Sequence, residues 1–178
     1  MKMVSVAVVC ASLMLSGWAS GLAAVAEEQR TPPISLTPDE ALILRLINEE
    51  RRERNLRSLE LDPVLVKVAR EHSLDMERRD YFGHVSPAPE ATTPLDRYAS
   101  ALGRRPEAVV GENVGRAPQP VMGLMHLYMM KSPEHRANIL DGEYARVGVG
   151  IHALDDGRVW LTEMFGGEFA SDARTSGS

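Results

Sequence analysis

His84 follows an aromatic pair and a glycine and precedes a Ser-Pro turn, within the segment RRDYFGHVSP at 78–87. Imidazole is the side chain that titrates near neutral pH, so it can move a proton or bind a metal ion through a neutral nitrogen. The segment has the pattern of a helix that ends in a turn. Two interpretations follow: His84 is an ordinary loop residue, or it forms one wall of a functional site.

The other isolated histidines have simpler interpretations. His72 falls on an apolar helical stripe, which favours a buried, hydrogen-bonded histidine over a ligand. His126 lies among methionines and leucines, where helix packing is the simpler interpretation, although it could line a cleft. His152 alternates with Val149 and Ile151 in a predicted strand, so we expect it to face solvent.

Hydrolase signatures are absent from the sequence, which contains neither Gly-x-Ser-x-Gly nor His-Glu-x-x-His. Ser86 and Ser132 each precede a proline, and turn or N-cap roles account for both. The residues that could do chemistry must therefore be brought together by the fold.

Helix starts are clearly marked. Thr37-Pro38-Asp39-Glu40 is a capping box that predicts a helix through 41–54, and its EERRER segment at 49–54 is typical of a solvated face with i,i+4 ion pairs. Asp62-Pro63 predicts a second helix start. Its apolar residues recur at helical spacing, which indicates one buried stripe: Leu65, Val68, Ala69, His72 and Met76.

Three shorter helices are predicted further along the chain. Thr93-Pro94 starts one that ends near Gly103, and Ser132-Pro133-Glu134 starts one that runs through Leu140. Between them, PVMGLMHLYMM at 120–130 is apolar nearly all round, which predicts a buried helix.

Two strands are predicted at 146–154 and 158–166, joined by the turn DDG, and a further short strand at 108–115. The first of these alternates Val147, Val149, Ile151 and Ala153 on one face. Because helices and strands do not alternate regularly, we predict an α+β fold: an α-β-α sandwich with a central, mainly antiparallel sheet flanked by helices.

The N-terminus has the pattern of an export signal. Residues 1–26 hold Lys2 and a long apolar run that ends in Ala24-Val25-Ala26, which predicts a secretory signal peptide cleaved after Ala26, with nearby alternatives at Ala23 or Ala24. An uncleaved membrane anchor is the alternative. The single cysteine, Cys10, lies in this segment, so the mature chain would have no disulfide.

The remaining boundaries follow from composition. Residues 27–36 are interpreted as a linker, 37–168 as the folded domain and 169–178 as a flexible tail. The formal charge is −5 over 178 residues, and no Lys/Arg run interleaves with aromatic residues, which argues against a nucleic-acid partner. We therefore expect a secreted protein, extracellular or periplasmic, without stable membrane insertion after cleavage and monomeric.

An ordered set of motifs resembles the CAP superfamily of cysteine-rich secretory, antigen 5 and pathogenesis-related proteins, and in particular its small bacterial, disulfide-free branch with an SCP-like domain. The resemblance covers about 42–166 and rests on motifs that occur in the family's order: INEERRERNLRSLELDPVL, AREHSLDM, YFGHVSP, GENVG, SPEHRANIL, VGVGIHA and VWLTEMFG.

The resemblance implies a cleft built around two histidines and two acids. His84, Glu112 and His135 match the family's motifs, whereas the second acid does not carry over. Met129 occupies the place where the bacterial branch usually has tryptophan, and Ser132 stands about where eukaryotic members have that acid. Glu134 is adjacent to His135, but neighbours on a helix point about 100° apart, so it need not face the cleft.

Two imidazoles and one carboxylate match an open zinc site with three protein ligands and a water. Zinc or another divalent metal is therefore one expectation, and metal-free acid–base chemistry by the same residues is another. The resemblance implies a secreted binding module for a small apolar ligand such as a lipid, a peptide or a cell-envelope component. The alternative is a metal- or His/Glu-assisted, peptidase-like hydrolase. Asn113 and Arg136 are expected to be structural, with Arg136 paired to Glu112 or Glu163.

Overall fold

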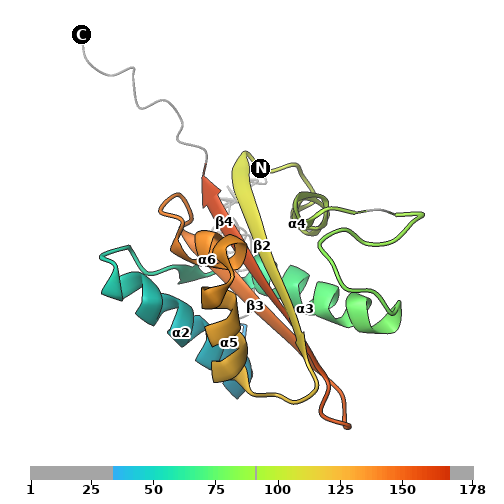
Figure 1. Cartoon of the computed structure of the whole chain (residues 1–178). Coiled ribbons are helices and arrows are strands. Elements are labelled where there is room, and N and C mark those ends of the chain that lie inside the picture. Colours follow the sequence, from blue (N-terminus) through green and yellow to red (C-terminus); the bar gives the residue numbers. More distant parts are fainter. Residues whose placement is uncertain (1–33, 91, 169–178) are drawn as a thin grey trace, which may run out of the picture. The chain divides into compact units, whose positions relative to one another are not determined.

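A four-stranded sheet forms the centre of the protein, in a computed structural model that describes residues 34–90 and 92–168 (Figure 1). The strands lie in the order β1-β3-β4-β2. β1 is parallel to β3, whereas β4 is antiparallel to both β3 and β2. Their bounds are β1 (Glu60–Leu61), β2 (Ala108–Ala117), β3 (Arg146–Ala153) and β4 (Val159–Glu168).

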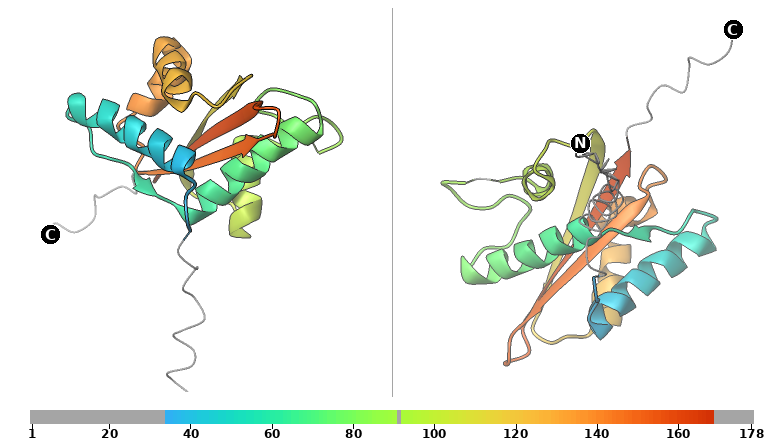
Figure 2. Two further views of the ribbon diagram at one scale, coloured as in Figure 1. Left: turned by 90° about the horizontal axis from the view of Figure 1, so that it is seen from below. Right: turned by 180° about the vertical axis from the view of Figure 1, so that it is seen from behind.

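Helices cover both faces of this sheet (Figure 2). One face carries α2 (Pro38–Glu53), α5 (Met122–Lys131) and α6 (Pro133–Leu140), and the other carries α3 (Pro63–Arg78) and α4 (Pro94–Leu102). The predicted α+β fold, an α-β-α sandwich with a mainly antiparallel sheet, is confirmed. The two-residue strand β1 was not predicted, and β2 is longer than expected.

The predicted helix starts are also confirmed. Thr37 and Glu40 exchange hydrogen bonds as a capping box at α2, and Thr93 and Asp96 do the same at α4. Asp62 accepts from two backbone N–H groups at the start of α3. Each side chain satisfies donors that a helix leaves unpaired in its first turn, so these signals are local and readable from the sequence.

Strand β3 packs differently on its two faces. Val147 and Val149 are fully buried against the α2 side, where they join the largest core cluster. On the opposite face, Gly148 and Gly150 lie directly beneath α3. A Cβ atom at Gly148 would lie 2.1 Å from the carbonyl carbon of Leu65, and one at Gly150 would lie 2.1 Å from a main-chain nitrogen of the same helix. Glycine is therefore what lets the α3 backbone approach the strand.

Arg51 contradicts the prediction that EERRER is a solvated face. Its side chain is 1% exposed, and its guanidinium donates to the carbonyl oxygens of Arg57, Ile139 and Asp141. The planar fork of five donors can satisfy several carbonyls at once, which is why an arginine can be buried there. The neighbouring pair Glu50 and Arg54 does form the expected exposed i,i+4 contact, at 2.6 Å.

Helix α5 contradicts the prediction of a buried helix, because only part of its surface is covered. Met122, Met125 and Met129 are buried, but Leu124, Leu127 and Tyr128 are 45%, 46% and 61% exposed. Apolar residues all round a helix predict burial only if neighbours cover every side. Here α2 and β2 cover one side, and the other carries no covering element among residues 34–90 and 92–168. No helix in these ranges is long and apolar enough to cross a membrane.

Candidate functional site

Glu112 forms the centre of the candidate site. It lies on β2 with its carboxylate almost completely buried, and each oxygen accepts a short hydrogen bond. Nδ1 of His84 donates to Oε1 over 2.9 Å, and Nη2 of Arg97 donates to Oε2 over 2.6 Å. A buried carboxylate needs such partners because it has lost its hydration. The predicted pairing of His84 with Glu112 in one place is therefore present in the structure.

Arg97, on α4, holds the loop that carries His84. Besides Glu112, its guanidinium donates to the carbonyl oxygens of His84 and Thr92, both at 3.0 Å. The loop leaves α3 through Asp80, whose φ of 50° is in the left-handed region that turns the chain out of the helix. Arg97 was not identified from the sequence, because nothing about an arginine in a short predicted helix distinguishes a buried side chain from a solvated one.

His84 is half exposed, and its hydrogen bond to Glu112 raises its pKa above the ordinary value of 6.5. Protonation therefore favours the folded contact. The stabilising contribution is fully present below the unfolded pKa near 6.5 and is lost as the pH rises through the higher folded pKa. Among the described residues only Nδ1 of this ring is hydrogen-bonded, so Nε2 is free to face a ligand.

His72 lies beneath this pair. Its side chain is fully buried, its Nε2–H donates to the carbonyl oxygen of Gly83 over 3.0 Å, and the same nitrogen is 3.6 Å from Oε1 of Glu112. Burial lowers its pKa, against the opposing effect of Glu112, so the ring is neutral at pH 7. The predicted buried, hydrogen-bonded role is confirmed, and the residue additionally braces the loop before His84.

His135 lies in the first turn of α6 and is half buried. Burial lowers its pKa, and the positive charge of nearby His84 lowers it further. Its main chain is tied to the sheet, because Nδ2 of Asn113 donates to its carbonyl oxygen over 3.1 Å. The predicted structural role of Asn113 beside Glu112 is thus confirmed.

Arg136 does not form the predicted ion pair. It is exposed on α6, while the arginine that contacts Glu112 is Arg97, and the side chain that contacts Glu163 is Asn113. The prediction failed because the neighbour of His135 on a short helix points away from the sheet.

Glu163, on β4, is a buried acid that was predicted from the sequence only as a possible partner of Arg136. Its Oε2 accepts from Nδ2 of Asn113 over 2.9 Å, and its Oε1 has no partner among the described residues. Burial raises the pKa of Glu163 from 4.5 to about 7. Through Asn113 and Asn138, whose Nδ2 donates to the carbonyl oxygen of Glu112, this acid is linked to the site.

The implied metal ion does not fit this arrangement. In the ranges 34–90 and 92–168, no three His, Cys, Asp or Glu side chains gather closely enough to bind a metal. Both oxygens of Glu112 already accept bonds, one of them from the cationic Arg97. A zinc site at His84, Glu112 and His135 rests on the resemblance alone, and the contacts of the described residues give it no support.

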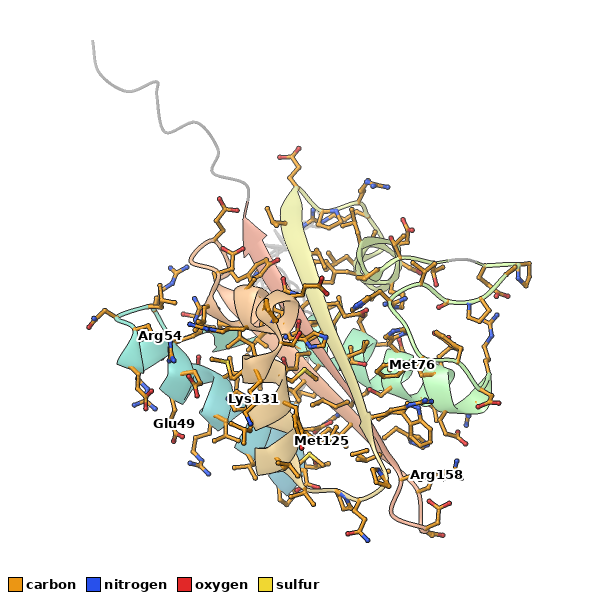
Figure 3. All side chains as sticks on the ribbon, in the orientation of Figure 1. Glu49, Arg54, Met76, Met125, Lys131 and Arg158 are labelled. Carbon is orange, nitrogen blue, oxygen red and sulfur yellow. The ribbon has the colours of Figure 1, made fainter. Side chains whose placement is uncertain are left out.

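A groove of about 610 Å³ opens beside His135, between β2 and α5. Figure 3 shows Met125 on α5 and Met76 on α3, on either side of β2. A Cβ at Gly115 would lie 2.8 Å from the Cε atom of Met129, the flexible end of a side chain that packs against this strand. The lining is almost entirely apolar: Phe82, Val114–Gln119, Val121, Leu124, Met125, Tyr128, Met129, Ser132 and His135.

The structure also shows where the residues near the expected place of the family's second acid lie: Ser132, Met129 and Glu134. Ser132 lies at the groove and occupies the predicted N-cap position of α6, but its side chain makes no cap hydrogen bond. Met129 is buried against β2. Glu134 is exposed, and its charge is a minor contributor to the raised pKa of His84.

Two further histidines lie outside the groove. His126 is buried on α5, which confirms its packing role, although neither ring nitrogen has a partner in the described part of the chain. His152 is not fully solvated as predicted: its side chain is 25% exposed and lies 3.6 Å from Glu77. The strand alternation predicted a solvent-facing ring, but this face of β3 is covered by α3, which carries Glu77.

Replacing Glu112 with glutamine should lower the pKa of His84 and leave the fold in place. The carboxylate is the main cause of the raised value, and glutamine keeps the shape without the charge. Titration of the ring resonances by NMR measures the change directly. Glu134→Gln is the matched control and should lower the same pKa by a smaller amount. An unchanged His84 titration in Glu112→Gln would show that the contact does not persist in solution.

Comparisons with known proteins identify the family of this chain. The family model CAP: Cysteine-rich secretory protein family matches residues 44–165. The chain is 32% identical over 152 residues to the uncharacterized protein YkwD of Bacillus subtilis (strain 168), covering 83% of this chain and 56% of that protein. The chain thus spans about half the length of that relative.

Two solved structures are similar. An extracellular protein containing an SCP domain from Bacillus anthracis str. Ames is 30% identical with a TM-score of 0.59, covering 75% of this chain and 44% of that one. An outer surface protein from Borrelia burgdorferi shares the fold with a TM-score of 0.67 at 20% identity, covering 76% of this chain and 97% of that one. With its fold and its ordered motifs, the chain belongs to the CAP, or cysteine-rich secretory protein, family.

Proposed function

We propose that this protein is an exported binding module that holds a ligand with an apolar body and an anionic group in the groove between β2 and α5. The single observation that carries the proposal is the uncovered apolar wall of α5. Leu124 and Tyr128 line the groove and are 45% and 61% exposed. A contiguous exposed apolar patch of this kind marks a binding surface in soluble proteins.

The ionisable residues that line the groove favour an anionic group on the ligand. Arg116 and His135 line it, and no carboxylate among the described residues does so. The guanidinium of Arg116 lies over the Phe82 ring, 5.1 Å from its centroid, which keeps the cation at the apolar wall. An anionic group on the ligand therefore meets a local positive charge, although the whole chain carries a formal charge of −5.

Binding is favoured over hydrolysis by the state of Glu112. A general base needs a free oxygen directed at the substrate, whereas both oxygens of this carboxylate accept hydrogen bonds from His84 and Arg97. The hydrolase signatures are absent as well. Export is supported by the apolar N-terminal run, and by similarity to an extracellular and to an outer surface protein.

Leu124→Glu should weaken binding of 11-(dansylamino)undecanoate, a fluorescent probe with an apolar chain and a carboxylate, by about tenfold or more. Tenfold corresponds to about 1.4 kcal/mol, less than the value of burying one leucine side chain, and the added carboxylate repels the probe. Fluorescence titration of the purified protein gives the dissociation constant.

Leu127→Glu is the matched control, since Leu127 lies on the same helix at 46% exposure but does not line the groove. It should bind the probe as the unmodified protein does. Equal affinities in the two variants, or no binding by the unmodified protein, would contradict the proposed function.

A further inference from the structure

The free edge of β2 borders the groove. β2 is an outer strand of the sheet and pairs only with β4, so alternate residues direct their main-chain N–H and C=O groups away from the sheet. The strand register identifies the residues of β2 whose main-chain groups point away from the sheet. Unpaired groups on a sheet edge are a template for another strand.

Two independent observations identify the outward-facing residues. The carbonyl oxygen of Glu112 accepts from Nδ2 of Asn138, so Glu112 faces away from β4. The N–H of Ile151 donates to Glu40, so Ile151 and its opposite residue Leu161 do not bond to each other, and Leu161 bonds to β2 instead. Leu161 lies opposite Gly115.

It follows that the main chain of Gly115 is hydrogen-bonded to β4. The main-chain groups of its neighbours Val114 and Arg116 point away from the sheet, as those of Glu112 do, because alternate residues of a strand point to the same edge. Outside the strand ladders, no backbone hydrogen bond within the described residues reaches the main chain of either one. Asn138 covers the edge only at Glu112. Both outward-facing residues line the groove, with α5 on one side and Phe82 on the other.

We propose that the ligand is an extended peptide that adds a strand to the edge of β2 at Val114 and Arg116, a proposal that rests on the proposed binding function. The peptide's main chain pairs with the two outward-facing residues. Its alternate apolar side chains pack against Leu124 and Tyr128 of α5, and a carboxylate lies beside Arg116 or His135.

The unpaired main-chain groups of β2 favour a peptide over a hydrocarbon as the ligand. An acyl chain in the groove would cover the N–H and C=O groups of Val114 and Arg116 and offer them no partner, which carries a desolvation cost. A peptide strand supplies a donor and an acceptor at matching spacing, with side chains alternating at the same period as β2. The apolar wall and the polar edge are then satisfied together.

The probe is a six-residue peptide of alternating threonine and leucine with a free C-terminal carboxylate, and displacement of 11-(dansylamino)undecanoate measures its affinity. Two N-methylated versions carry methyl groups on alternate amides, one set on each edge of the peptide strand. Because only one edge of the peptide can pair with β2, one version should bind about tenfold more weakly than the other. Equal affinity of the two versions overturns the proposal.

Variants at position 116 test the protein's side of the pairing. Arg116→Pro removes the outward N–H but no bond to β4, and a proline is tolerated on an edge strand. Arg116→Ala removes the same side chain and keeps the N–H. The peptide should bind about tenfold more weakly to Arg116→Pro than to Arg116→Ala. The dansyl probe, which has no main chain, should bind equally to both, and equal peptide binding counts against the proposal.

The two proposals fail in different ways. If the dansyl probe binds in a Leu124-dependent manner and the peptide does not displace it, strand addition is wrong and groove binding stands. If neither probe binds the unmodified protein, the groove function is wrong and the inference falls with it. Should circular dichroism show that Arg116→Pro is unfolded, the comparison of the two N-methylated peptides decides alone.

Discussion

Gly148→Ala should destabilise the protein by about 3 kcal/mol, at the upper end of the cost of overpacking a core. The added Cβ would lie 2.1 Å from the carbonyl carbon of Leu65 and 2.2 Å from the nitrogen of Val66. These are main-chain atoms of α3, so no side chain can rotate away, and the whole helix must move from the sheet. Urea unfolding measures the change in the free energy of unfolding.

Gly123→Ala is the matched control because a Cβ there has nothing within 4 Å. Gly123 lies within α5, where alanine is a better helix former by about 1 kcal/mol, so this variant should be slightly stabilised. Opposite signs for the same substitution would confirm that position 148 is limited by the approach of α3. If Gly148→Ala keeps the original stability, α3 does not pack on β3 as described.

Glu163→Gln should remove a pH-dependent loss of stability on the order of 3 kcal/mol. The pKa of Glu163 is raised from 4.5 to about 7, and one pKa unit corresponds to about 1.4 kcal/mol. An acid with a raised folded pKa costs nothing below its unfolded pKa, where both states are protonated. The cost grows between pH 4.5 and 7 and is complete above 7.

Unfolding of the unmodified protein and of Glu163→Gln at pH 5 and pH 8 tests this. The variant should gain stability relative to the unmodified protein between the two pH values, whatever the constant cost of the new amide. Glu53→Gln, at a position with a 73% exposed side chain, should show no such gain. If the free energies of unfolding of Glu163→Gln and the unmodified protein differ by the same amount at both pH values, Glu163 is not a buried acid with a raised pKa.

Local signals were readable from the sequence, and tertiary ones were not. Capping at Thr37 and Thr93 involves residues three apart, and the alternation at Val147 and Val149 requires only one buried face. By contrast, Arg51 is buried through carbonyls about 90 residues away. No window of sequence contains that information, and an exposed arginine has the same local pattern.

The candidate site likewise contains residues that the sequence predicted and residues that only the tertiary arrangement reveals. His84 and Glu112 were placed together by their resemblance to family motifs, and the structure brings them within 2.9 Å. Arg97, which completes the enclosure of the carboxylate, belongs to no motif. The apolar pattern of α5 was recognised, but whether Leu124 meets a neighbour or solvent depends on how the other helices are arranged.

The position of β4 has a consequence for synthesis. β4 is the last strand among residues 34–90 and 92–168, yet it lies between β3 and β2 in the sheet. A nascent chain that has left the ribosome up to Ala153 holds β2 with no strand to pair with, and β3 with only the two residues of β1. Long-range pairing must wait until the final strand emerges. Folding of this domain therefore completes only after translation has passed Glu168, and until then its unpaired apolar strands are prone to aggregation.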